Sequence, residues 1–226
     1  MTSSSQSSHI KLYWFTGHFP HIVVPLEYQN GNVVVHPTLR IVLHNGASLA
    51  TARIGKGIDL NGYRQYADLG RQRDNCMGNL ERCPHGLTIS FDVNPRVLSN
   101  NQHFISSGPY AIFYRNGRLH AEFRTPTKTW TTSASGINRN QWQHVEVTWH
   151  EDRGLQMYIN DQQVASTNNY QSHSPQDISD YKVYIGKPGG GRDGTYANGK
   201  IDEVEFWYAP RDVLGAFGVL ADPAGE

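Results

Sequence analysis

The chain has 226 residues, with 20 Lys and Arg against 20 Asp and Glu, and its formal net charge is zero. Because neither sign of charge is in excess, the composition gives no support for binding to nucleic acid or to an anionic membrane surface. Twenty-two glycines, twelve tyrosines and 18% charged residues are typical of one large, turn-rich β-domain, and no apolar run is long enough to insert into a membrane.

The chain begins with a serine-rich stretch that lacks the apolar segment of a signal peptide. We expect residues 1–9 to be disordered, residues 10–220 to form a single domain, and residues 221–226 to be a tail. Segments in which apolar and polar residues alternate predict strands at residues 10–15, 21–28, 32–36, 39–43, 54–60, 66–69, 87–93, 103–106, 110–115 and 119–124.

Two Asn-Gly pairs predict tight turns between these strands. Asn30-Gly31 is expected to join the second strand to the third, and Asn116-Gly117 the ninth to the tenth. The one helix expected covers residues 210–219, where Pro210 suits a first turn. Short strands at close spacing, with almost no helical period, predict an all-β sandwich of two sheets.

The clearest local pattern lies at residues 142–161, where two strands flank a polar turn. Every second residue is apolar in residues 144–149, and the same period recurs in residues 155–159. Gly154 ends the turn and can adopt a positive φ. A β-hairpin is therefore predicted, with Trp149 on the face that looks into the core.

Six short motifs occur in the order found in pentraxin and laminin-G-like domains, and they cover roughly residues 50–215. They are Gly57–Gly62, Gly86–Phe91, His144–Trp149, Gly154–Asn160, Tyr181–Gly186 and Asn198–Trp207. The chain therefore resembles the pentraxin/laminin-G-like family, closest to modules of animal receptor ectodomains such as those of adhesion G-protein-coupled receptors. The resemblance implies an antiparallel jelly-roll of the concanavalin A-like type, in an extracellular or cell-surface protein.

Cys76 and Cys83 are the two cysteines of the chain. The loop between them is short, polar and sterically open to a disulfide, and the alternative is two unrelated thiols in a cytosolic protein. The receptor modules that the chain resembles place two cysteines just before the strand that matches Gly86–Phe91. The resemblance thus implies a Cys76–Cys83 disulfide and an oxidising compartment, although the sequence has no acceptor site for N-linked glycans.

Sandwiches of this type also host glycan-cleaving enzymes, which carry Glu-x-Asp-x-x-Glu on one strand. The matching strand here is Lys200–Glu205, in which lysine replaces the leading glutamate and the acids are spaced differently. The chain has no nucleophile-elbow or P-loop motif either. We therefore expect that the protein is not an enzyme.

Asp202 is expected to be a buried acid. If Val204 and Phe206 face the core, strict alternation turns Asp202 inward as well. A buried carboxylate needs a cation or several hydrogen-bond donors. Backbone N–H groups of adjoining loops are one set of partners, and a calcium ion held with loop carbonyls is the other.

The segment after Tyr181–Gly186 bears on the calcium question. Pentraxins have several acids there, whereas residues 187–193 of this chain contain only Asp193. The double calcium site of pentraxins is therefore not expected, and the one cofactor considered is a single structural calcium ion at Asp202. The glycines at 189–191 predict a flexible hairpin loop rather than a phosphate cradle, because no helix follows them.

Aromatic residues near loops are the remaining candidates, because aromatic rings stack on sugars or anchor a protein partner. The candidate ligand-binding residues are Trp130, Tyr170 and Tyr196. For Trp130 a core position has equal support, since one sequence does not determine which side of a strand faces inward.

These observations favour a non-catalytic extracellular recognition module, of a receptor or of a matrix protein, that binds a protein or glycan ligand. A carbohydrate-binding lectin domain is the alternative, and a divergent glycan-cleaving enzyme is a weaker one. The module is expected to be part of a larger chain or of an oligomer.

Overall fold

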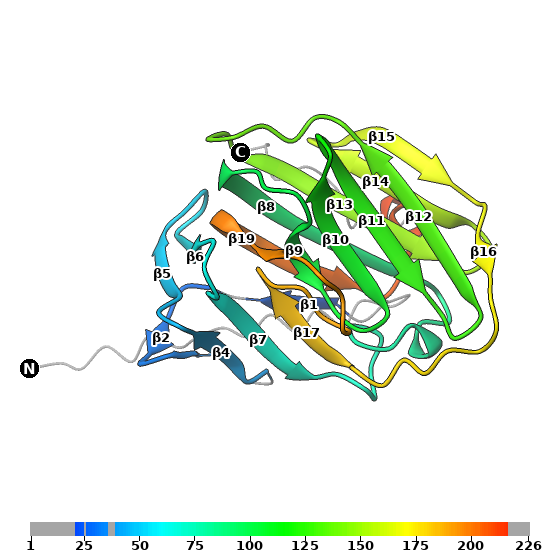
Figure 1. Cartoon of the computed structure of the whole chain (residues 1–226), viewed down its shortest axis with the longest axis horizontal. Helices are drawn as coiled ribbons and strands as arrows, with labels where there is room; N and C mark the ends of the chain where they lie inside the picture. Colours follow the sequence, from blue (N-terminus) through cyan, green and yellow to red (C-terminus); the bar gives the residue numbers. More distant parts are fainter. Residues whose placement is uncertain (1–20, 25, 36–38, 217–226) are drawn as a thin grey trace, which may run out of the picture.

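The computed structural model describes residues 21–24, 26–35 and 39–216, which form two β-sheets packed face to face (Figure 1). Every strand pair is antiparallel in this part of the chain except β18 with β9. The predicted two-sheet jelly-roll sandwich is confirmed. The strand expected at residues 10–15, the start at residues 1–9 and the tail at residues 221–226 lie outside the described residues.

Sheet A has eight strands in the described residues, in the order β15, β14, β13, β8, β19, β6 and β5, and β1 pairs with β19. Their bounds are β1 His21–Val24, β5 Ser48–Thr51, β6 Lys56–Asn61, β8 Leu87–Val97, β13 Gln143–His150, β14 Gly154–Ile159, β15 Gln162–Thr167 and β19 Asn198–Trp207.

Sheet B has eleven strands in the same part of the chain, in the order β16, β12, β11, β10, β9, β17, β7, β4, β3 and β2, with β18 beside β9. Their bounds are β2 Gln29–Asn30, β3 Val33–Val34, β4 Ile41–His44, β7 Tyr66–Arg71, β9 Gln102–Ser106, β10 Tyr110–Arg115, β11 Arg118–Arg124, β12 Lys128–Ala134, β16 Gln171–Ser172, β17 Lys182–Ile185 and β18 Thr195–Tyr196.

Two short helices accompany the sheets in the described part of the chain. The 3-10 helix η1 covers Leu80–Arg82, and α1 covers Arg211–Ala216. The helix expected at residues 210–219 is therefore present at α1, and residues 217–219 lie outside the described part.

The predicted hairpin is β13 and β14. Gly154 has a φ of +74°, as its place at the turn requires. Val145 pairs with Ile159, and Trp149 pairs with Leu155, so the apolar residues of both strands share one face. That face lies against sheet B, and β11 and β12 cross in front of β13 and β14 (Figure 1).

Apolar side chains of both sheets form one core. On β8 the residues Leu87, Ile89, Phe91 and Val93 are at most 1% exposed, as their alternation predicts. Across the sandwich, the Trp130 ring lies 5.5 Å from the Trp149 ring in an edge-to-face arrangement. Such pairs of large rings stabilise the fold by more than the burial of their apolar area alone.

The turn predicted at Asn116-Gly117 joins β10 to β11. Both residues have positive φ, 51° and 80°, which a two-residue hairpin turn with the twist of the strands needs. The turn predicted at Asn30-Gly31 is displaced toward the C-terminus, because Asn30 belongs to β2 and the turn follows it at residues 31–32.

Only the first half of the segment predicted as one strand at residues 21–28 forms a strand. This is β1, which pairs with the second half of β19 in sheet A, where the His21 ring stacks on the Trp207 ring. Residues 26–28 lie outside any strand, and β2 begins at Gln29 in sheet B. Strands β5, β12, β15, β16 and β18 were not predicted, because several are short and most are rich in Thr, Ser and Gln.

The Cys76–Cys83 disulfide is present, with the two sulfur atoms 2.05 Å apart. Both cysteines are buried although their loop is polar, because Met77 and Leu80 of the same loop enter the core. The Tyr110 hydroxyl donates a hydrogen bond to the Met77 carbonyl at 2.6 Å, which attaches the loop to β10.

Trp149→Ala and Trp130→Ala should each lower the free energy of unfolding by about 3–5 kcal/mol, because each deletes a fully buried indole. The measurement is urea unfolding at equilibrium. The double variant should cost less than the sum of the two, since the rings contact each other. Tyr63→Ala is the control, because Tyr63 is 72% exposed and should stay within about 0.5 kcal/mol of the parent. A Trp130→Ala variant as stable as the parent would contradict the packing of β12.

Candidate binding surface

The outer face of sheet B carries aromatic side chains that four strands bring together. On β7, Ala67 and Leu69 face the core, so Tyr66 and Asp68 point outward. Tyr66 pairs with His44 of β4 on one side, and Asp68 pairs with Tyr184 of β17 on the other. We call the set of His44, Tyr66, Tyr184 and Tyr196 the tyrosine cluster.

Tyr66 is the centre of the tyrosine cluster. His44 stacks on it with ring centroids 4.4 Å apart and planes inclined by 10°. Tyr184 meets it edge-on at 5.9 Å, and Tyr196 lies tilted at 6.2 Å. Three of the four residues are partly exposed, whereas Tyr184 is buried and only 7% exposed. The cluster therefore presents adjoining ring faces and edges on one side of the sheet.

A lysine and an aspartate give the tyrosine cluster charge. The Lys187 amine lies 4.2 Å from the centre of the Tyr184 ring and 4.8 Å from that of Tyr66. Asp68 pairs with Lys182 at 3.2 Å. Burial, then the Asp68 carboxylate, raise the pKa of Tyr66, and burial raises the pKa of Tyr184 well above its ordinary range. Both hydroxyls therefore stay protonated at neutral pH and can donate hydrogen bonds.

The glycine-rich loop that carries Lys187 is held on the sheet by Arg192. The Arg192 guanidinium donates to the carbonyls of Ser107 at 2.6 Å, Gly108 at 3.1 Å and Gly189 at 3.2 Å, and to the Glu122 carboxylate at 3.0 Å. The expectation of a flexible hairpin loop did not include this anchor. A buried guanidinium with several acceptors restrains the loop and so fixes the place of Lys187.

Glycines let this loop lie directly on the sheet. A Cβ atom at Gly194 would stand 2.5 Å from the His103 ring, which is closer than any side chain could approach. The covered His103 is 2% exposed. Burial, and then the nearby Arg192, lower the pKa of His103 to about 4, so the ring under the loop is neutral at physiological pH.

The structure brings together two of the three residues predicted to bind ligand. The rings of Trp130 and Tyr170 lie 5.5 Å apart near β16, where Tyr170 is 48% exposed and the Lys128 amine lies 5.0 Å from the centre of its ring. Tyr196 lies elsewhere, in the tyrosine cluster. Trp130 is fully buried, so its assignment to a binding surface is wrong. Its strand turns the ring inward to Trp149, and Thr129 and Thr131 face outward instead.

The prediction that Asp202 faces the core is also wrong. β19 has a bulge between Asp202 and Glu205, at which Glu203 takes a φ of +46°. Ile201, Val204 and Phe206 all enter the core, so the extra residue turns Asp202 to the outer face. There it pairs with Asp92 of β8, and loop residues bury it to 1% exposure.

Backbone N–H groups hold the Asp202 carboxylate. These groups are one of the two sets of partners expected from the sequence, the other being a calcium ion. Ile54 donates to one oxygen at 3.0 Å, and Glu203 donates to the other at 2.9 Å. The adjacent Asp92 carboxylate pairs with Arg53 and His144, each at 2.9 Å. Within the described residues, no group of three or more His, Cys, Asp and Glu side chains is arranged to hold a metal ion.

Part of the outer face of sheet A is covered by side chains and loops of the chain itself. Arg211 at the start of α1 reaches the buried Glu146 carboxylate at 2.8 Å and Asp161 at 3.1 Å, and its guanidinium lies 4.4 Å from the centre of the Tyr158 ring. Burial raises the pKa of Glu146. Because its own arginines and loops occupy this face, the outer face of sheet B is the better candidate for binding a ligand.

The signals in the sequence identify this surface only in part. Tyr66 and Tyr196 are recognisable as aromatic residues near loops, but His44, Tyr184 and Lys187 were missed. The alternation within β17 could have indicated that Tyr184 faces outward. No pattern in one sequence could have placed it beside Tyr66, because the two strands are far apart along the chain.

A sequence profile of the concanavalin A-like lectin/glucanases superfamily matches residues 61–213. Among curated proteins, adhesion G-protein coupled receptor D1 of Bos taurus is 28% identical over 115 residues, which are 47% of this chain and 12% of that receptor. The chain thus spans a small part of the length of this relative. No helix of the described residues is long and apolar enough to cross a membrane.

Solved structures share the fold at low sequence identity. Domain 4 of the extracellular arabinanase AbnA from Geobacillus stearothermophilus, in complex with arabinotriose, has a TM-score of 0.54 and 16% identity over 84% of this chain and 83% of that domain. A Trypanosoma rangeli sialidase mutant with trans-sialidase activity has a TM-score of 0.61 and 17% identity over 88% and 32%. Botulinum neurotoxin type C, whose cell entry depends on two ganglioside molecules, has a TM-score of 0.55 and 12% identity, over 80% of this chain and 46% of that chain.

The thermal midpoint of the protein should move by less than about 1 °C when EDTA replaces calcium. A calcium ion at Asp202, present at a hundred times its dissociation constant, would add about 2.7 kcal/mol and raise the midpoint by roughly 5–10 °C. Differential scanning calorimetry in both buffers makes the comparison. A fall of that size in EDTA would show that the carboxylate binds calcium in addition to its backbone donors.

Glu203→Gln should stabilise the protein at pH 8 by about 1 kcal/mol. This is less than the full pKa shift of Glu203 would give, because the side chain is half exposed and solvent screens its charge. Burial and the neighbouring Asp202 raise the pKa of Glu203 from 4.5 to about 7. Ionisation in the folded state therefore costs stability, which falls as pH rises from about 4.5 through about 7. Urea unfolding should show no difference at pH 4. Asp152→Asn, at an exposed turn, is the control, and a Gln variant with the pH profile of the parent would contradict the shift.

Proposed function

Because the chain belongs to the concanavalin A-like lectin/glucanases superfamily, we propose that it is a non-catalytic extracellular recognition module that binds a glycan on the tyrosine cluster. The observation that carries the proposal is the arrangement of His44, Tyr184 and Tyr196 around Tyr66 on the outer face of sheet B. On the other sheet the equivalent face is occupied by Arg211 and its partners.

The chemistry of the tyrosine cluster suits a sugar. The C–H faces of a sugar ring pack on aromatic faces, and its hydroxyls need both donors and acceptors. Tyr66 and Tyr184 supply protonated hydroxyls, Lys187 supplies an ammonium donor, and Asp68 supplies an acceptor. Arg192 fixes the loop of Lys187, so a ligand need not order it on binding.

An extracellular location is supported by two observations. The Cys76–Cys83 disulfide is stable in an oxidising compartment. The relative in Bos taurus is an adhesion receptor, and its matching segment is a small part of a long chain. We therefore also propose that the domain functions as one module of a larger protein or of an oligomer.

A protein ligand and catalysis are the competing functions. A protein partner could use the same rings as anchors, since interface hot spots are rich in tyrosine. Catalysis is favoured by the surroundings of Glu203, because burial and the neighbouring Asp202 raise its pKa to about 7, which suits a general acid. It is opposed by the neighbouring Asp202, which is closed to solvent with both oxygens bonded to N–H groups.

Tyr66→Ala should weaken glycan binding about tenfold or more, because Tyr66 contacts every other ring of the tyrosine cluster. The measurement is a glycan array with the parent protein, followed by calorimetric titration of the best glycan with each variant. Tyr63→Ala is the matched control, since Tyr63 is exposed and is not part of the cluster.

Three outcomes would change the proposal. If no glycan binds while Tyr66→Ala loses adhesion to cells, the ligand is a protein. Equal binding by the parent and by Tyr66→Ala would move the site away from the tyrosine cluster. Hydrolysis of an array glycan that Glu203→Gln abolishes would establish an enzyme.

A further inference from the structure

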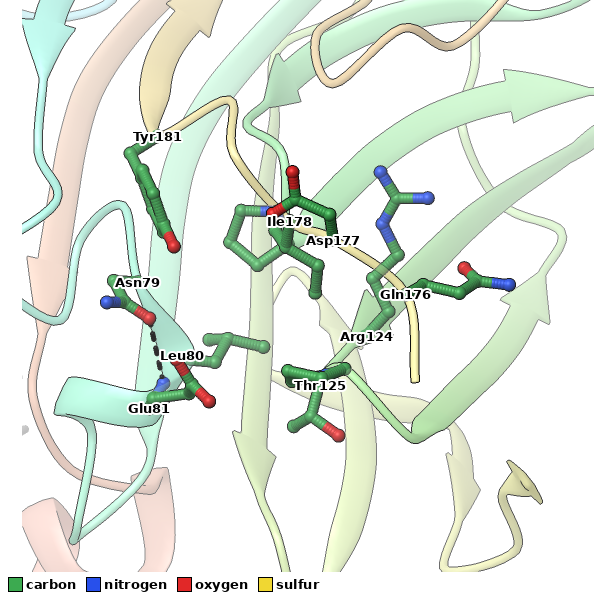
Figure 2. Close-up of a pocket in the computed structure, with 11 residues that line it drawn as sticks. Asn79, Leu80, Glu81, Arg124, Thr125, Gln176, Asp177, Ile178 and Tyr181 are labelled. Carbon is green, nitrogen blue, oxygen red and sulfur yellow. Dashed lines mark hydrogen bonds between the residues drawn. The ribbon is translucent and has the colours of Figure 1, made fainter. Parts of the chain in front are cut away.

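A small pocket of about 150 Å³ lies beside the disulfide loop, and none of its lining residues belongs to the tyrosine cluster. Figure 2 shows its walls, with Tyr181 and η1 on one side and Arg124 with Gln176 on the other. Four separate segments supply the lining: the disulfide loop, Pro109, the turn between β11 and β12, and the chain that leads into β17.

The polar groups of the pocket are of two kinds. Asn79 and Arg124 are structural, because Asn79 caps η1 and Arg124 donates to the carbonyls of Gly108 and Gly190. The side chains of Glu81, Gln176 and Asp177 and the hydroxyl of Tyr181, in contrast, form no hydrogen bond or ion pair within the described residues. Glu81, Gln176 and Asp177 are exposed and lie at the rim of the pocket, and Tyr181 forms part of its wall (Figure 2).

The charges around the pocket disfavour an ionic ligand. An anion would meet the carboxylates of Glu81 and Asp177. A cation would meet Arg124 in the wall, and the guanidinium groups of Arg71 and Arg73, each 5.8 Å from the centre of the Tyr181 ring. A neutral molecule with several hydroxyls can donate to the two acids and accept from the amide and phenol without an unfavourable charge contact.

The apolar part of the pocket and its size agree with that chemistry. Leu80, Pro109, Pro126 and Ile178 contribute surface on which the C–H groups of a sugar ring can pack. The volume is below the roughly 300 Å³ at which pockets for drug-sized ligands begin, so it suits a group of the size of one sugar ring.

The wall formed by η1 is rigid before a ligand arrives. The Cys76–Cys83 disulfide closes the loop that carries Asn79, Leu80 and Glu81, and the Met77 carbonyl accepts a hydrogen bond from Tyr110. On the opposite side, the backbone N–H of Gln176 donates to the Pro126 carbonyl at 2.8 Å. Pre-organised walls reduce the entropy lost on binding.

We infer that this pocket is a second glycan site, which holds one uncharged monosaccharide unit with Glu81 and Asp177 as the acceptors of its hydroxyl protons. The inference rests on the proposed function for the class of ligand, but it concerns residues that the tyrosine cluster does not share. A terminal sugar of a longer glycan and a free monosaccharide would be held by the same contacts.

The test is titration of the full chain with neutral methyl glycosides of glucose, galactose, mannose, arabinose and N-acetylglucosamine, followed by amide NMR. At least one glycoside should shift the amides of Glu81, Thr125 and Asp177 in a saturable way. The expected dissociation constant is on the order of 1 mM, as for other ligands of about a dozen non-hydrogen atoms.

Variants of the lining residues show whether the glycoside binds in the pocket. Asp177→Asn and Glu81→Gln should each weaken the titration about tenfold, whereas Asp152→Asn, an exposed acid on the turn between β13 and β14, should leave it unchanged. Absence of saturable shifts at the pocket with all five glycosides would overturn the inference. So would saturation of the same amides by methylguanidinium alone, which would make it a site for a basic side chain.

The Tyr66→Ala variant separates this inference from the proposed function. If it retains the pocket shifts but has lost binding of the array glycan, both sites stand. If the pocket shifts appear and Tyr66→Ala binds the array glycan as the parent does, only the tyrosine cluster fails. If array binding depends on Tyr66 and the pocket gives no shifts, only the second site fails.

Discussion

The contact between Trp149 of β13 and Trp130 of β12 joins the two sheets within the core. Each ring is at most 2% exposed, and each lies on a strand whose other face must be directed away from the core. Once these rings are inside, the polar face of the β13–β14 hairpin is on the outside of sheet A. The aromatic face of β7 and β17 is, by the same packing, on the outside of sheet B.

The two outer faces satisfy this constraint in different ways. Sheet A presents Asp92, Glu146 and Asp202, and buried carboxylates require partners because their desolvation is costly. Arg53, Arg211 and backbone N–H groups supply those partners, so loops and α1 cover the face. Sheet B presents the tyrosine cluster together with the Asp68–Lys182 and Arg192–Glu122 ion pairs, and the rings of His44, Tyr66 and Tyr196 stay partly exposed.

The glycine-rich loop lies on this open face and is held there by Arg192. Arg192 is bonded to Glu122 and to three backbone carbonyls, and the same loop begins with Lys187 over the rings of Tyr66 and Tyr184. The pocket beside the disulfide is built in a similar way, since a covalent closure positions Leu80 and Glu81. Both candidate sites therefore rest on short segments whose mobility is restricted by contacts outside the site itself, and such restriction favours selective binding of weak ligands such as sugars.

The amino-acid sequence by itself determined the β-hairpin, the Asn116-Gly117 turn and the inward face of β8, because each depends on residues close together in the chain. The Cys76–Cys83 pair was implied by the family resemblance. Only the tertiary structure decided that Trp130 points inward, since alternation defines two faces of a strand without saying which one meets the other sheet. The direction of Asp202 was decided by the bulge at Glu203, which shifts the alternation by one residue. The tyrosine cluster likewise exists only in the folded chain, because pairing of β4, β7 and β17 brings together rings from positions 44, 66 and 184.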